Sequence, residues 1–239
     1  YNFITTIILF SCGHFFLHYI TNLKTKQSSN FNIYLIYGVF FAGIIALLVN
    51  FFLPLGLMVN STFALLFIVY FFLRIIYNKK NWKNVILYLF IFSLICSLLI
   101  LFSNINRPDA GLYHLPFTKI INEYKVIFGL TNIHFRFGHT SIIQYSNAFN
   151  FNYLFKENGI LIPQTIIITS VILYFFLDFL KFEKLKEINI STIFLFFCII
   201  FSIYSYNRYS SFGNDAGGNI LFIFLIYVSS KLLNKKKIK

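Results

Sequence analysis

Long apolar runs with very few charged residues constrain the fold of this chain more than any other sequence feature. A helix needs roughly 20 mostly apolar residues to cross the hydrocarbon core of a lipid bilayer, and the runs approach or reach this length. Short polar or basic segments separate most of them, which is the pattern of successive membrane spans. The sequence therefore predicts an all-α fold, a polytopic transmembrane bundle of about seven helices. The predicted spans are residues 2–20, 33–53, 55–77, 85–102, 160–180, 191–206 and 219–233.

The composition excludes a soluble domain. Hydrophobic residues make up 58% of the chain and charged residues only 11%, whereas a soluble domain carries about 25% charged residues. The formal net charge is +13, but the basic residues lie in short segments between apolar runs, as they do in cytoplasmic loops. We therefore expect membrane lipid around the chain and no nucleic-acid partner.

Lysine residues set the expected orientation, because cytoplasmic loops are enriched in lysine and arginine. The less basic side holds residues 103–159, the longest segment between two spans, which we place outside the cytoplasm. Within it, residues 115–128 and 141–155 are predicted to be amphipathic helices on the membrane surface. We treat residues 1–239 as a single membrane domain of the cell (inner) membrane and, because the chain begins at Tyr1 rather than Met, as a fragment. The lysines of the basic side are Lys24, Lys26, Lys79, Lys80, Lys83, Lys181, Lys184, Lys186, Lys235, Lys236, Lys237 and Lys239.

The first polar cluster outside the predicted spans contains Asp109 and His114. Pro108 ends the preceding helix, so that Asp109 lies just outside the membrane. A carboxylate at this depth can take a proton from a hydroxyl group or hold a divalent cation against a phosphate. The alternative is an N-cap for a surface helix that begins at Ala110, which is the commoner role of such an aspartate.

The second polar cluster places His134, Arg136 and His139 within a few positions of one another. Arginine binds phosphate in fork geometry, and histidine binds phosphate or acts as an acid or base. The alternative is an interfacial helix end whose basic side chains meet lipid headgroups. The two histidines are five residues apart rather than four, so their spacing does not favour a zinc pair on one helix face.

The third polar cluster surrounds Asp215, directly before the last apolar run. N-capping of the last helix is the simplest role for this aspartate. Gly213, Gly217 and Gly218 allow backbone or a ligand to approach closely. The functional alternative is a second carboxylate that faces the same external cavity as Asp109.

Other polar features receive no catalytic role. Asp178 lies near a basic loop and is expected to pair with Lys181, while His14 and His18 are expected to form an interfacial pair. The sequence contains no P-loop, no G-x-S-x-G motif and no H-E-x-x-H motif. ATPase, serine hydrolase and zinc protease activities therefore lack support.

One series of residues carries a resemblance to a known group of proteins. It comprises Asp109, residues 112–115, 121–124, 129–130, 132–134 and 136–138, and Ser141. The pattern resembles a poorly characterised group of bacterial multi-pass membrane proteins related to the GT-C glycosyltransferases. Residues 211–218 resemble a second, weaker block of the same group.

This resemblance implies an enzyme that works at the external face of the membrane with a sugar carried on a polyprenyl phosphate. It implies that Asp109 acts as a base or a metal ligand. Asp109 is followed by Ala110 rather than by a second acid, and a divalent cation stays an open alternative. The implied partners are membrane lipids, the polyprenyl-phosphate sugar and a glycan or lipid acceptor.

We therefore predict an inverting sugar transfer from a lipid-phosphate donor to a hydroxyl acceptor, with Asp109 as the base. Basic side chains would stabilise the departing phosphate, and a second carboxylate would shape the sugar pocket. The alternatives are a polysaccharide polymerase, a lipid-linked sugar transporter or flippase, and a non-catalytic assembly subunit. Charged residues are missing from the centres of the predicted spans, which counts against a transporter. The residues predicted to bind substrate are His114, His134, Arg136, His139 and Asp215.

Overall fold

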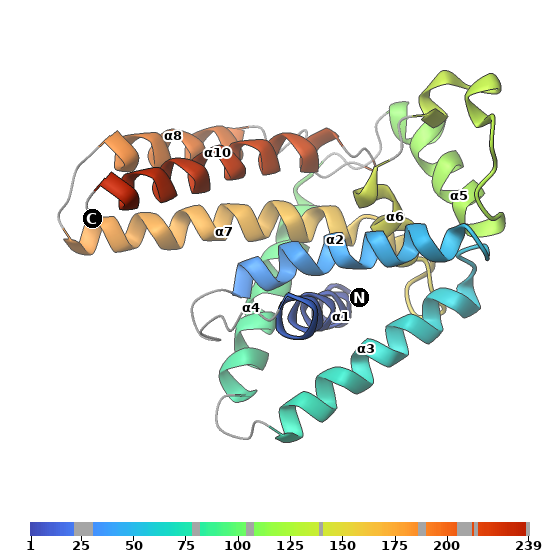
Figure 1. Ribbon diagram of the computed structural model, residues 1–239, viewed down its shortest axis with the longest axis horizontal. Coiled ribbons are helices and arrows are strands. Elements are labelled where there is room, and N and C mark those ends of the chain that lie inside the picture. Colours follow the sequence, from blue (N-terminus) through green and yellow to red (C-terminus); the bar gives the residue numbers. More distant parts are fainter. Residues whose placement is uncertain are drawn as a thin grey trace.

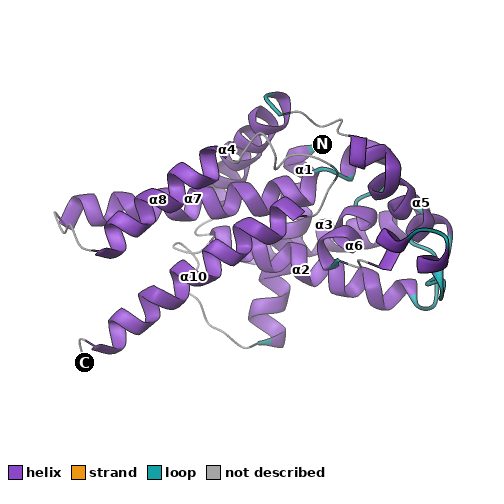
Figure 2. Cartoon of the chain, turned by 90° about the horizontal axis from the view of Figure 1, so that it is seen from above, coloured by secondary structure: helices purple, strands orange, loops and turns teal. Residues whose placement is uncertain are grey.

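The computed structural model describes residues 1–21, 31–77, 82–103, 108–138, 141–185, 190–204, 212 and 215–237. These residues form helices and loops, with no strand among them (Figures 1 and 2). The predicted all-α fold is therefore confirmed. The α-helices are α1 Asn2–Phe15, α2 Phe31–Asn50, α3 Leu57–Tyr77, α4 Trp82–Leu101, α5 Leu115–Glu123, α6 Ile142–Phe149, α7 Ile162–Leu185, α8 Ile190–Tyr204 and α10 Asp215–Lys237. The shorter turns are η1 Phe16–Ile20, η2 Ala110–His114, η3 Leu130–Asn132, η4 Phe135–Gly138 and η5 Lys156–Gly159.

Five helical segments of the described chain are long and apolar enough to cross a membrane. The apolar part of α8, Thr192–Tyr204, is shorter. This supports the predicted membrane character with five candidate spans rather than seven. The five segments are Asn2–Ile20, Phe31–Asn50, Leu57–Arg74, Trp82–Leu101 and Lys156–Lys181.

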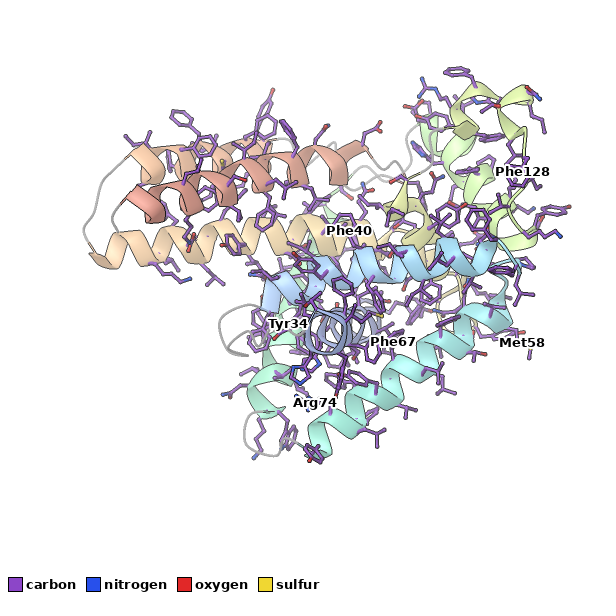
Figure 3. The ribbon with its side chains drawn as sticks, viewed as in Figure 1. Tyr34, Phe40, Met58, Phe67, Arg74 and Phe128 are labelled. Atoms are coloured by element: carbon purple, nitrogen blue, oxygen red, sulfur yellow. The ribbon has the colours of Figure 1, made fainter. Side chains whose placement is uncertain are left out.

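The candidate spans differ in how far the protein itself covers them. In the most apolar window of the α7 segment 72% of the residues are buried, against 17% in α3 and 22% in α4. Helix α7 is therefore central, whereas α3 and α4 present apolar side chains outward, as lipid-facing helices do. Figure 3 shows this for α3, which runs from the exposed Met58 at one end to Arg74 at the other.

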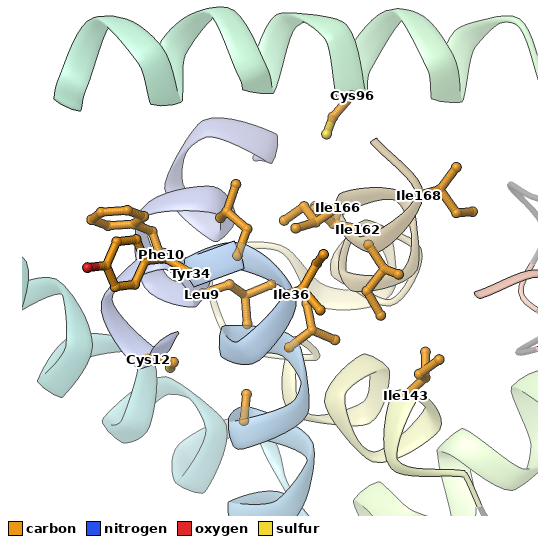
Figure 4. Close-up of a cluster of buried hydrophobic side chains, with 14 of the residues drawn as sticks. Leu9, Phe10, Cys12, Tyr34, Ile36, Cys96, Ile143, Ile162, Ile166 and Ile168 are labelled. Carbon is orange, nitrogen blue, oxygen red and sulfur yellow. The ribbon is translucent and has the colours of Figure 1, made fainter. Parts of the chain in front are cut away.

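Two glycines allow the backbones of α1 and α2 to touch. A Cβ atom on Gly13 would lie 1.7 Å from the carbonyl oxygen of Tyr34, and one on Gly38 would lie 1.8 Å from that of Leu9. Small residues at such crossings let helices approach closely and gain contact area. Figure 4 shows Leu9 in the resulting core beside Ile166 of α7, and both side chains are fully buried.

The segment between α4 and α7 differs from its prediction. The two predicted amphipathic stretches contain helices that are shorter, Leu115–Glu123 and Ile142–Phe149. Helix α5 is amphipathic, with Phe117 and Ile121 buried and Lys119 exposed. Helix α6 corrects the prediction, because every residue from 143 to 149 is buried, so this helix does not lie on a surface.

Close packing against α2 explains the burial of α6. A Cβ atom on Gly43 of α2 would lie 2.3 Å from the carbonyl oxygen of Ile142, so the two backbones meet directly. Asparagines of the α2–α3 hairpin add hydrogen bonds: Asn50 donates to the carbonyl oxygens of Ile121 and Tyr124 at 3.1 and 3.0 Å. Because these carbonyls lie in and directly after the last turn of α5, the helix itself does not pair them, and Asn50 supplies a donor.

Asn60 of α3 makes a similar connection to α6. Its side-chain nitrogen donates to the carbonyl oxygens of Leu55, Ala148 and Phe151 at 2.7, 3.0 and 2.7 Å. Asn60 is fully buried, and a buried amide has to find such partners. The segment from α5 to α6 is thus fastened to the ends of two candidate spans.

Candidate functional site

A cavity of about 910 Å³ lies where α5, α6 and the N-terminal end of α10 meet. Figure 1 shows that the first turn of α10 lies beside α6, and Gly217 of α10 approaches Ile143 of α6 closely enough that a Cβ atom would lie 3.0 Å from the Ile143 Cδ1 atom. Polar side chains dominate the lining, unlike that of the protein core. The lining residues are Tyr113, His114, Phe117, Phe135, Arg136, Ser141, Gln144, Asp215, Gly218 and Asn219.

A π-helical turn carries the first part of the site. Residues 110–114 form this turn, which runs directly into α5. Pro116 in the first turn of α5 lacks a backbone N–H, and its ring would clash with the carbonyl of Leu112 in a regular α-helix. The wider π turn relieves this clash, and such turns are frequent at functional sites. As a result Tyr113 and His114 reach the cavity.

Asp109 precedes the π turn and does not cap it. Its backbone is already helical, with φ −62° and ψ −27°, and its side chain makes no capping hydrogen bond. The N-cap interpretation of this aspartate is therefore wrong. Its carboxylate is exposed and acts electrostatically on Tyr113 and His114.

Arg136 reaches the cavity from η4 and is held by Tyr113. Its Nη1 atom donates to the Tyr113 hydroxyl at 2.7 Å, and its guanidinium carbon lies 4.5 Å from the centroid of the Tyr113 ring and 5.6 Å from that of Phe135. Stacking and hydrogen bonding together fix a planar guanidinium. Because Arg136 is exposed, the rest of its donor fork is free to bind an anion.

His134 lies behind Arg136 rather than in the cavity lining. Its Nδ1 atom accepts the backbone N–H of Arg136 at 3.3 Å, and its ring stacks on those of Tyr113 and Phe135 at centroid distances of 6.2 and 5.2 Å. His134 therefore supports Arg136 and does not itself line the cavity.

Burial sets the protonation states of the two side chains at the base of the site. His114 is 8% exposed, and this burial lowers its pKa from 6.5; Asp215 and Asp109 raise it in part and Arg136 lowers it further. The imidazole is therefore neutral at pH 7. Burial, followed by the charge of Asp109, raises the pKa of Tyr113, so the phenol keeps its proton.

The structure brings together three of the predicted site residues and leaves one outside the described residues. His114, Arg136 and Asp215 line the same cavity, although they come from three separate segments. Asp109 does not line this cavity but acts electrostatically on His114, and His139 falls outside the described residues.

A zinc-type metal site is not formed by the side chains that the structure describes. Among the described ranges, no group of three or more His, Cys, Asp or Glu side chains is placed to hold a metal ion. Three protein side chains usually hold a catalytic zinc ion.

Sequence reasoning missed several residues of the lining. Tyr113 belongs to the series that carries the resemblance but was not predicted to bind substrate, yet it accepts a hydrogen bond from Arg136 and its ring contacts that of His114. Gln144 of α6 is buried and lines the cavity. Its signal in the sequence is a polar amide inside a stretch that proves to be buried. Asn219 one turn into α10 has no comparable signal.

Two polar pairs predicted elsewhere are present. Asp178 contacts Lys181 at 3.4 Å as expected, and it also pairs with Lys231 and accepts the Tyr227 hydroxyl at 2.7 Å, which links α7 to α10. The rings of His14 and His18 lie 5.4 Å apart. Neither pair touches the cavity.

Among the described residues the structure is helical, with five segments long and apolar enough to cross a membrane and a polar cavity, which is consistent with a membrane protein. The chain belongs to the family described as "Domain of unknown function (DUF8201)", whose model matches residues 1–239. No curated protein and no solved structure matches the chain.

Proposed function

We propose that this chain is a membrane glycosyltransferase of GT-C type, which moves a sugar from a polyprenyl-phosphate donor to a hydroxyl acceptor. One observation carries the proposal. Arg136, His114 and Asp215 line a single cavity of about 910 Å³, which is of the size that holds a small-molecule substrate. A fixed guanidinium suits a phosphate, and carboxylates suit the hydroxyl groups of a sugar.

We also propose a topology for the chain in the membrane. Helices α8 and α10 complete a set of seven spans, and residues 103–159 lie outside the cytoplasm of a cell (inner) membrane. The distribution of lysines supports this orientation. The cavity then lies at the external ends of the spans, where the phosphate of a lipid-linked sugar is found.

The proposed reaction is a single displacement. The acceptor oxygen attacks the anomeric carbon and forms the new glycosidic bond. The bond between the anomeric carbon and the phosphate oxygen breaks, and its electron pair leaves with the lipid phosphate. The acceptor proton passes to the carboxylate of Asp109.

The other residues act on charge and position. Arg136 offsets the charge that develops on the departing phosphate, held in place by the Tyr113 hydroxyl. Neutral His114 offers a hydrogen bond without adding positive charge. Asp215, at the first turn of α10, binds sugar hydroxyls.

The test uses the full-length gene in the source organism. Asp109→Asn and Arg136→Gln are expected to reduce transfer about a hundredfold or more, with the lipid-linked donor accumulating and one surface glycan lost. Lys125→Gln, which removes an exposed cation outside this cavity, is the matched control for Arg136→Gln. Protein levels and membrane insertion are measured for all three variants.

The result that overturns the proposal is equally specific. If surface glycans and lipid-linked sugars are unchanged in both variants at normal protein levels, neither residue takes part in transfer. A non-catalytic assembly subunit is then the better account. If a lipid-linked sugar accumulates on the cytoplasmic face alone, the chain is a flippase rather than a transferase.

A further inference from the structure

A second cavity, of about 590 Å³, lies on the other side of the same helical segment. His114 and Phe117 face the first cavity, whereas Gly111, Leu115 and Thr118 line the second. The turn η2 and helix α5 therefore form a wall between two separate spaces. Nothing in the proposed transfer uses the second space.

The deep part of the second cavity is lined mainly by apolar side chains. Aliphatic and aromatic side chains from three other segments, including Leu57, Phe151 and Ile160, complete its wall. The two polar side chains there already donate within the protein. Thr118 donates to the carbonyl oxygen of His114 at 2.9 Å, and the amide nitrogen of Asn122 donates to the carbonyl oxygens of Leu55 and Ala148 at 3.0 and 3.1 Å. A ligand group buried here is therefore a hydrocarbon.

The rim of the second cavity carries both signs of charge. Lys119 and Glu123 form an exposed pair, with Nζ and Oε1 3.7 Å apart and side chains 73% and 52% exposed. Glu157 of η5 is also exposed and lines the same space. Two carboxylates and one ammonium group thus surround the opening, with an excess of one negative charge.

The position of this cavity relative to the candidate spans matters as well. Leu57 is the first residue of α3, and Ile160 lies two residues before α7 begins. The cavity is therefore at the ends of two candidate spans, the level at which lipid headgroups meet water. A lipid enters such a space with its chain along the apolar wall and its headgroup at the charged rim.

We propose that this second cavity binds a zwitterionic phospholipid with a primary amine in its headgroup. The acyl chain packs against Leu57, Phe151 and Ile160. The ammonium group lies between the carboxylates of Glu123 and Glu157, and the phosphate lies toward Lys119. An anionic phospholipid meets two carboxylates and one lysine, so this rim selects against it. The inference stands independently of sugar transfer.

Gly111 lines the second cavity, so a larger residue at this position tests whether a lipid binds there. A Cβ atom on this glycine meets no atom within 4 Å, and its φ is not positive, so the backbone accepts a side chain at this point of the cavity wall. Gly218 of α10 is equally open and lines the first cavity. Gly111→Phe and Gly218→Phe are therefore matched plugs for the two spaces.

The experiment reconstitutes the full-length protein in nanodiscs of equal parts phosphatidylethanolamine and phosphatidylglycerol. Native mass spectrometry then counts the lipids that remain bound after release. We expect the unaltered protein and Gly218→Phe to retain phosphatidylethanolamine, and Gly111→Phe to lose it. The double variant Glu123→Gln/Glu157→Gln, which leaves the wall intact, is expected to weaken retention about tenfold, since each exposed charge pair contributes roughly a threefold effect.

Thermal unfolding of each variant confirms that it is folded. Two results overturn the proposal: retention of both lipids in proportion to their abundance, or equal loss in the two plug variants. Unchanged retention in Gly111→Phe overturns it as well, because the lipid then binds elsewhere. Loss of sugar transfer without any change in lipid retention concerns the proposed function alone.

Discussion

Replacing Gly38 by alanine is expected to force α1 and α2 apart. The new Cβ atom would lie 1.8 Å from the carbonyl oxygen of Leu9, whereas an ordinary contact needs at least 3.4 Å. The obstacle is backbone, so a side-chain rotation cannot relieve it. The helices must therefore separate along an interface whose residues Leu9, Leu35 and Val39 are completely buried.

The expected loss of stability on separating α1 and α2 has two sources. Overpacking of a core costs about 1–3 kcal/mol and more when backbone has to move. Lost dispersion contacts along the interface add to this cost. We expect the free energy of unfolding, measured by titration with sodium dodecyl sulfate in mixed micelles, to fall by about 3 kcal/mol or more in Gly38→Ala.

Gly218→Ala is the matched control for this prediction. Its Cβ atom meets nothing within 4 Å, and alanine is favoured over glycine in a helix by about 1 kcal/mol, so stability is expected to stay level or rise. If Gly38→Ala unfolds at the same detergent concentration as the unaltered protein, the direct contact between α1 and α2 is not present.

Two further predictions concern buried polar groups. Asn60→Ala is expected to lower the free energy of unfolding by about 3 kcal/mol, because three buried hydrogen bonds from its side chain to backbone carbonyl oxygens are lost; Asn158→Ala, at an exposed position, is its control, and equal stability of the two variants would contradict the role of Asn60. The pKa of His114, followed by NMR, is expected to rise in Arg136→Gln and to fall further in Asp215→Asn, because the guanidinium lowers it and the carboxylate raises it. Since the folded protein holds this pKa below 6.5, the unfolded chain binds the proton first, and stability is expected to fall as the pH drops below about 6.5. A lower His114 pKa in Arg136→Gln, or a higher one in Asp215→Asn, would refute the placement of the charges.

Local features of the sequence were sufficient to predict helices that are long and apolar enough to cross a membrane. The length of an apolar run and the scarcity of charge are properties of consecutive residues, and they predict a helix that buries its backbone polar groups within itself. All seven predicted segments contain a helix in the structure, five of them of spanning length and apolarity. The pairing of Asp178 with Lys181 was also predictable, because they lie three positions apart on one helix.

The placement of α6 needed the tertiary structure. Its sequence alternates polar and apolar residues like that of an interfacial helix, but Gly43 of α2 removes the side chain that would hold α6 at a distance. Asn50 and Asn60 then satisfy carbonyls at the edges of the segment. Neither effect is visible within residues 141–155 alone, because both come from residues about 100 positions earlier in the chain.

The candidate site divides in the same way. The sequence by itself determined which polar clusters lie outside the apolar runs, because polarity is local, and it therefore supplied His114, Arg136 and Asp215 as separate candidates. Only the tertiary structure decided that they share one cavity, since this depends on the packing of Gly217 against α6. The same packing leaves a second, apolar space on the far side of α5, which no pattern of consecutive residues describes, because its walls come from four separate segments that meet only when the helices are assembled.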